Sequence, residues 1–104
     1  GATIATTFFG PTSPSYGTPG PAPGRYFAGG GAAGTYDANP GSTISGGAGG
    51  GGPAFGSTGP TSLAGTAGTT NTGGGGGSDA TYCGTSNSPG AGGSGIVVIR
   101  YKFQ

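Results

Sequence analysis

The stretch GAGGSGIVVIRYKFQ (Gly90–Gln104) decides the expected fold, because a glycine-rich run changes there into an alternating strand pattern. Side chains of a β-strand point to its two faces in turn. The alternation places Val97, Ile99, Tyr101 and Phe103 on one face, and Ile96, Val98, Arg100 and Lys102 on the other. The first face is wholly apolar, so we expect a terminal strand over residues 96–104 that is buried along this face.

The composition leaves few large apolar side chains for a core. Leu, Ile, Val and Phe together account for 12 of the 104 residues, whereas glycine alone accounts for 30. This apolar fraction is below the level at which a chain is expected to build its own core. Glycine also loses more conformational freedom on folding than any other residue. The chain is therefore either a disordered low-complexity segment or a fold ordered by backbone hydrogen bonds and by packing against copies of itself.

The charge is too small to indicate a charged partner. Three basic and two acidic residues give a net charge of +1, which offers no electrostatic footprint for nucleic acid. It also excludes disorder that is driven by charge. The sequence has no apolar stretch of the roughly 20 residues that a membrane-spanning helix needs. We therefore expect no nucleic-acid partner and no membrane insertion. Position 1 is glycine and no signal peptide is seen, so we expect a mature product or a fragment.

The sequence divides into four parts of one glycine-rich domain, residues 1–104. The first part, Ala2–Phe9 (ATIATTFF), is β-branched and aromatic and predicts a second strand. Residues 10–24 carry prolines that block helix and ladder alike, which predicts a polyproline II spacer or loop. Residues 25–95 alternate glycine clusters with Ser, Thr, Ala and Asn, and helix is improbable there. The terminal strand is the fourth part.

The glycine clusters have two interpretations, which we weigh evenly. Backbones without Cβ atoms can pack side by side as polyglycine II helices with three residues per turn, or the clusters can be flexible linkers. The packed model predicts that Gly49, Gly75 and Gly93 have no room for a Cβ. The expected fold class is mainly β and irregular, with terminal strands and polyglycine or polyproline II segments, without α-helix, and ordered by oligomerisation.

The residues that catalysis and cofactors need are almost missing. There is no His or Glu, and Asp37 and Asp79 lie far apart in sequence. GGGAAG (Gly29–Gly34) fits the G-x-G-x-x-G pattern but lacks the strand before it and the helix after it. Cys83 has no Cys or His companion for a metal. We therefore expect no enzyme, no cofactor and no metal site.

The aromatic and aliphatic side chains are the candidate functional residues. Those on the expected strands are candidates for the core or an oligomer interface: Ile4, Phe8, Val97, Ile99, Tyr101 and Phe103. Others are candidates for receptor contact: Tyr16, Tyr26, Phe27, Tyr36 and Phe55. The alternative, which we favour, is that this second group pins glycine-rich loops.

Two segments carry a resemblance to a known family. The ending GGSGIVVIRYKFQ (Gly92–Gln104), preceded by GTTNTGGGGG (Gly68–Gly77), resembles the glycine-rich C-terminal domain of virion proteins of tailed bacteriophages. The resemblance implies a structural component of a tail fibre or appendage, located in the virion and extracellular. It also implies a homo-oligomer, either a trimer or a filament, whose other partners are virion proteins and a host surface glycan or outer-membrane protein.

Two other functions stay open. One is a subunit of a bacterial extracellular fibril that donates Ala2–Phe9 to the sheet edge of a neighbour. The other is an adhesin tip whose loops grip a surface glycan.

Overall fold

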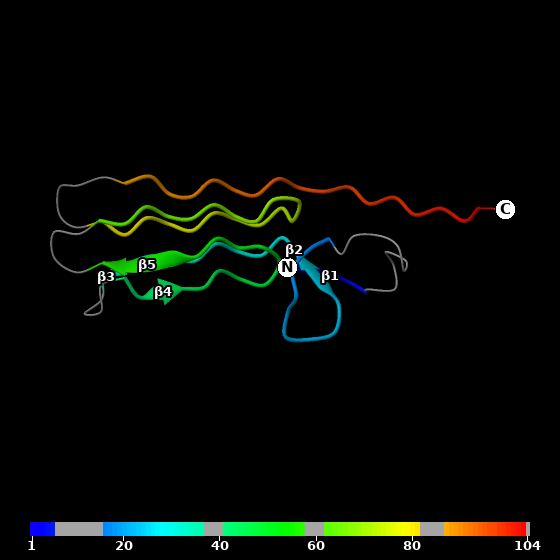
Figure 1. Cartoon of the computed structure of the whole chain (residues 1–104), viewed down its shortest axis with the longest axis horizontal. Helices are drawn as coiled ribbons and strands as arrows, with labels where there is room; N and C mark the ends of the chain where they lie inside the picture. The colour runs from blue at the N-terminus through cyan, green and yellow to red at the C-terminus, as the bar shows by residue number, and fades with distance from the viewer. Residues whose placement is uncertain (6–15, 37–40, 58–61, 82–86, 104) are drawn as a thin grey trace.

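Short strands alternate with extended segments as far as residue 57, and the described residues beyond are mainly extended segments without a named strand (Figure 1). The computed structural model describes residues 1–5, 16–36, 41–57, 62–81 and 87–103. The strands in these ranges are β1 (Ala2–Ile4), β2 (Arg25–Phe27), β3 (Thr35–Tyr36), β4 (Thr43–Ile44) and β5 (Ala54–Ser57). The described residues contain no helix, as the sequence predicts. The molecule is elongated, with extents of 63 × 22 × 18 Å.

The two sheets are small. β1 pairs with β2 in antiparallel register, with Ala2 opposite Phe27 and Ile4 opposite Arg25. In the second sheet the order is β3-β5-β4, and β5 runs parallel to β3 and antiparallel to β4. These ladders together cover only a small part of the chain, so they do not account for its order alone.

Extended segments outside the sheets are joined by backbone hydrogen bonds that recur every third residue. The N–H groups of Gly29 and Ala32 donate to the carbonyl oxygens of Gly49 and Gly52, both at 3.0 Å. In four more pairs of segments, donors three residues apart bond to acceptors three residues apart. The pairs are Gly75 and Ser78 with Gly29 and Ala32; Thr66 and Thr69 with Pro53 and Gly50; Gly65 and Gly68 with Ser88 and Ala91; and Gly90 and Gly93 with Gly77 and Gly74, with the donors named first. A repeat of three residues per turn is that of the polyproline II helix. These segments therefore form a packed array of polyglycine II type.

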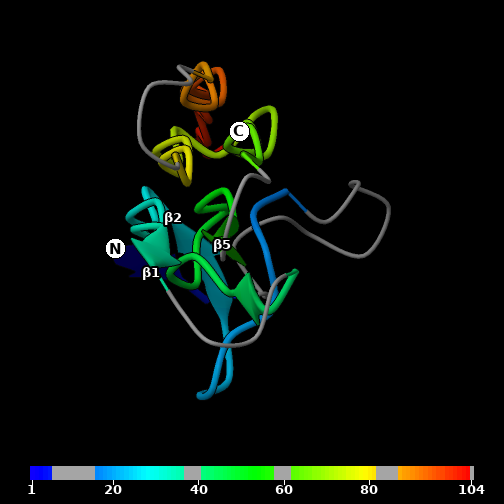
Figure 2. The same cartoon turned by 90° about the vertical axis from the view of Figure 1, so that its left-hand side faces the viewer.

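The array explains why glycine is required at many of its positions. Figure 2, which looks along the segments, shows them lying side by side in a bundle. A Cβ on Gly31 would lie less than 3.0 Å from the carbonyl oxygen of Gly76, and a Cβ on Gly93 would meet the oxygen of Thr69 as closely. Real Cβ atoms essentially never approach other atoms so closely. The flexible-linker interpretation of these clusters is thus wrong.

The three glycines that the sequence singled out differ in how tightly they are packed. Gly49 and Gly93 have no room for a Cβ, as predicted, and Gly49 also has a φ of +105°. At Gly75 the nearest atom is the nitrogen of Gly31 at 3.0 Å. The neighbouring backbone would have to shift by only a few tenths of an ångström to admit a methyl group at Gly75. Gly75 is therefore closely packed but does not exclude a Cβ.

Few large side chains are buried, in keeping with the composition. Among the described residues the buried apolar side chains are those of Phe27, Ala54 and Ala80, and the buried polar ones are those of Ser57 and Thr72. Most of these side chains are small, because backbones that approach closely leave no space for larger ones. Backbone packing therefore replaces most of the side-chain core.

Within the described residues, the first predicted terminal strand is present only as β1, and the second is not formed. β1 ends at Ile4, and the rest of the predicted strand from residue 6 onward lies outside the described residues. The structure assigns no strand to residues 96–103, so the predicted terminal strand is not formed within the single chain. A strand needs a paired neighbour, and the last backbone hydrogen bonds of this segment join Ser94 to Thr72 and Gly73.

Candidate assembly and contact surfaces

The C-terminal tail, residues 96–103, projects from the body of the molecule (Figure 1). Its predicted apolar face is exposed rather than buried in the single chain: Val97 is 85%, Ile99 80%, Tyr101 80% and Phe103 88% exposed. Our expectation of burial therefore fails for the chain taken alone, because no described segment of the chain covers this face.

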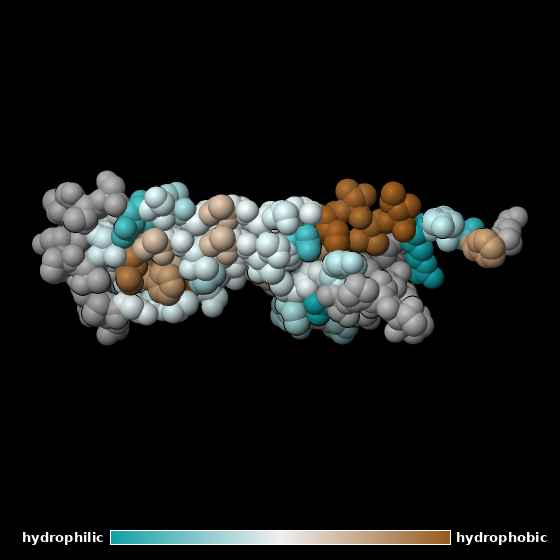
Figure 3. Space-filling model, turned by 45° about the horizontal axis from the view of Figure 1, so that its top comes forward, coloured by the Kyte–Doolittle hydropathy of each residue, from teal (hydrophilic) through white to brown (hydrophobic). Residues whose placement is uncertain are grey.

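An apolar groove of 370 Å³ lies at the root of the tail. Ala2, Ile4 and Phe27 line it from the first sheet, and Ile96 and Val98 line it from the tail. Both tail residues are half-buried. The sequence pattern places them on the face opposite to Val97. It is this face, with Ile96 and Val98, that packs against the chain's own body. Figure 3 shows a large apolar patch at this end of the body.

Among the described residues, no segment pairs with the outer edge of β1. Tyr26 exchanges both of its backbone hydrogen bonds with Thr18, at 2.9 and 3.0 Å, so its N–H and C=O point away from β1. Thr3 is opposite Tyr26 in the ladder. Since neighbouring residues of a strand direct their backbone groups to opposite edges, the N–H and C=O of Thr3 point outward. Thr3 is itself exposed, and within the described ranges no further backbone hydrogen bond reaches it.

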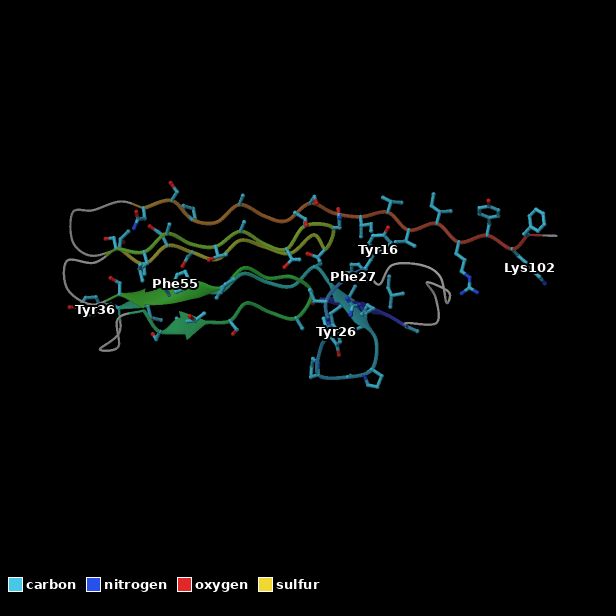
Figure 4. The ribbon with its side chains drawn as sticks, in the orientation of Figure 1. Tyr16, Tyr26, Phe27, Tyr36, Phe55 and Lys102 are labelled. Atoms are coloured by element: carbon cyan, nitrogen blue, oxygen red, sulfur yellow. The ribbon has the colours of Figure 1, made fainter. Side chains whose placement is uncertain are left out.

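Tyr36 and Phe55 lie at the other end of the molecule (Figure 4). Tyr36, at the end of β3, is 73% exposed, and Phe55 on β5 is half-buried. Their strands are neighbours in one sheet. Tyr36 is therefore the candidate receptor-contact residue with the most accessible surface, and it is remote from the tail.

The remaining candidates for receptor contact are used within the fold. Phe27 is buried, and a Cβ on Gly17 would collide with its ring. The ring of Tyr26 lies against Gly20, and its hydroxyl accepts a hydrogen bond from the N–H of Ala22 at 3.2 Å. These contacts are those of side chains that pin a glycine-rich loop.

Arg25 ties the same loop to β2. Its Nε donates to the carbonyl oxygen of Tyr16 at 2.9 Å, and its guanidinium also donates to the carbonyl oxygen of Gly17. Tyr16 is half-buried. The five receptor-contact candidates thus fall at two distant places and do not form one surface.

The interface candidates are only partly brought together. Ile4 joins the groove at the root of the tail, whereas Phe8 lies outside the described residues. The sequence pattern does not single out Thr3, Ile96 and Val98 as interface residues. The signal that could have identified Ile96 and Val98 is that the second face of the tail begins with these two apolar residues. The outward direction of the Thr3 backbone groups depends on the pairing of Tyr26 with Thr18, which no local sequence pattern shows.

The G-x-G-x-x-G match is part of the array. Its first residue, Gly29, donates its N–H to Gly49 and accepts from the N–H of Gly75 at 2.8 Å. The N–H of Ala32 is bonded to the oxygen of Gly52. Backbone groups that are engaged in this way do not cradle a phosphate. Asp37 and Cys83, for which the sequence predicts no catalytic or metal-binding role, lie outside the described residues.

Comparison with known proteins gives one match. A family model described as a glycine-rich domain matches residues 1–102. No curated protein and no solved structure matches the chain. In the described part of the chain, no helix has the length and apolar character to cross a membrane.

Proposed function

We propose, from the premise that this chain belongs to the glycine-rich domain family, that it is a non-enzymatic structural component of a bacteriophage virion. It works in a tail fibre or related appendage, in the virion and outside the cell, as a homo-oligomer that also contacts other virion proteins. The family match covers the glycine-rich character alone. The phage setting follows from the resemblance of Gly68–Gly77 and Gly92–Gln104 to virion domains.

The exposed tail is the observation that carries the proposal. Val97, Ile99, Tyr101 and Phe103 place a continuous apolar row in water, and exposed apolar surface of this kind marks an interaction site. The rest of the rod is uncharged for most of its length and held by backbone hydrogen bonds. A rod with an adhesive end suits a mechanical role.

Contact with the host surface is a second candidate function, favoured by Tyr36. This side chain is exposed at the end of the rod that lies away from the tail (Figure 4). An arrangement with attachment at one end and contact at the other fits an appendage that binds a surface glycan or an outer-membrane protein.

The bacterial fibril with a donated N-terminal strand is disfavoured. Ala2–Ile4 already pairs with Arg25–Phe27 of the same chain. Donating Ala2–Phe9 to a neighbour would break this ladder before any new one forms.

Immunogold electron microscopy tests the proposal. An antibody raised against the purified chain is applied to phage particles and cells from the same source culture. Gold on tail appendages supports the proposal. Gold on filaments of the cell surface, or inside cells only, would overturn it.

A further inference from the structure

β1 and the root of the C-terminal tail line the same apolar groove. Thr3 directs a backbone donor and acceptor outward, and the tail from residue 96 to residue 103 has no strand partner within the described chain. An extended segment can add to an exposed sheet edge through main-chain hydrogen bonds, while alternate side chains fill pockets beside it. The groove is lined by Ala2 and Ile4 of the same strand as Thr3 and by Phe27 of β2.

We propose that the tail of a second copy of this chain adds as a strand to the open edge of β1 and seats its apolar side chains in the groove. The inference rests on the homo-oligomer of the proposed function and names the two surfaces that meet. The chain's own tail does not fill this place. Its root, Ile96 and Val98, forms one wall of the groove, and the residues beyond run away from the body (Figures 1 and 3).

The area that this contact buries is that of a small interface. The two aromatic and two aliphatic side chains of the exposed row bring about 350–600 Å² per tail. The groove and strand edge that they cover lose a similar area, so one contact buries roughly 700–1,200 Å², which reaches the lower end of specific interfaces. Every copy takes part in two such contacts, because it offers one tail and one edge.

The contact is heterologous, since the tail of one copy meets a different surface on the next. Such contacts close into a ring when the rotation between copies allows it, and otherwise continue as a filament. A second copy is favoured over an unrelated protein because the extended tail and the receiving edge are both present on this one chain.

A matched pair of substitutions at Thr3 tests the inference. Thr3→Pro removes the outward N–H, and proline is tolerated at such edge positions because the ladder to β2 does not use this donor. Thr3→Val keeps the N–H and the β-branched shape. Sedimentation equilibrium should show the wild type and Thr3→Val self-associating, with the association of Thr3→Pro weakened at least tenfold.

The outcomes separate the inference from the proposed function. If Thr3→Pro associates like the wild type while Ile99→Asp does not, the homo-oligomer stands and docking at β1 is wrong. If the wild type stays monomeric at every concentration, the homo-oligomer itself is wrong.

A second measurement does not depend on the folding of the proline variant. A spin label is attached to Thr3→Cys in a Cys83→Ser background, and this protein is mixed with unlabelled, ¹⁵N-enriched wild-type chain. We expect paramagnetic broadening of the amide signals of residues 97–103 in the enriched copy. Broadening confined to other segments, or none at concentrations at which the chains associate, would overturn the docking.

Discussion

Gly31 packs directly on Gly76, and this contact shows how the molecule replaces side chains with backbone. A Cβ on Gly31 would lie less than 3.0 Å from the carbonyl oxygen of Gly76. On either side of the contact, Gly75 and Ser78 donate hydrogen bonds to the segment that contains Gly31, both at 2.8 Å. The close approach and the hydrogen bonds therefore depend on each other.

Replacing Gly31 with alanine should destabilise the fold by about 2–4 kcal/mol, from overpacking and from weakened backbone hydrogen bonds. Gly30→Ala is the matched control, because a Cβ at Gly30 has no atom within 4 Å and its φ is not in the left-handed region. That change should be neutral or stabilising by up to about 1 kcal/mol, through the unfolded chain. Urea unfolding followed by circular dichroism compares the two. Equal stabilities would contradict the packed array.

The sequence predicts the packed array only as one of two alternatives. The glycine clusters allow both close packing and linkers. Nothing in the local sequence distinguishes Gly30, where a Cβ would have open space, from Gly31, where a Cβ would collide with another segment. That difference depends on a segment some 45 residues away (Gly31 to Gly76). Composition correctly predicts that the described residues contain no helix, because glycine and proline disfavour helix interiors.

The two faces of the tail show a second limit of the sequence. Alternation correctly separates Val97 and Ile99 from Ile96 and Val98, but it does not say which pair the chain covers. The wholly apolar face is the stronger candidate for a core by composition, and it is the one left exposed. Which face is covered depends on the position at which the chain leaves the array, at Gly95, and on the position of β1. Both are features of the tertiary structure.

Ile99→Asp should abolish self-association while leaving the single chain folded. Ile99 is 80% exposed in the single chain, so a charge there costs little until a partner covers it, when burial of an unpaired carboxylate becomes costly. Lys102→Ser is the control and should associate normally. Analytical ultracentrifugation measures association and circular dichroism measures folding. If the two variants associate equally well, the apolar row is not an interface.

Tyr36→Ser should reduce binding to host cells at least tenfold without changing assembly. Tyr36 is exposed at the end of the rod opposite the tail, and stacking of its ring on a sugar or an apolar receptor patch would be lost. Tyr101→Ser serves as the comparison, since we expect it to impair assembly instead. Fluorescently labelled oligomer is titrated onto host cells. Undiminished binding by Tyr36→Ser would remove this end of the rod as the contact site.

Thr72→Val should destabilise the molecule by about 1–3 kcal/mol, because it leaves two backbone groups without partners. The hydroxyl of Thr72 donates to the carbonyl oxygen of Thr69 at 2.6 Å and accepts from the N–H of Gly74 at 3.1 Å. The side chain is only 4% exposed, so water does not replace these bonds. Thr70→Val, at an exposed position of the same turn, should change stability by less than about 0.5 kcal/mol.

The backbone of Thr72 gives this prediction a second readout. Its N–H donates to Ser94 at 2.9 Å, and its carbonyl oxygen accepts from Ala28 at 2.8 Å, so this one residue joins the turn to two other segments. Loss of the hydroxyl should therefore speed hydrogen exchange at the amides of Ala28 and Thr72 as well as at Gly74. Faster exchange at Gly74 alone would show that the turn opens independently, and that Thr72 does not couple these segments.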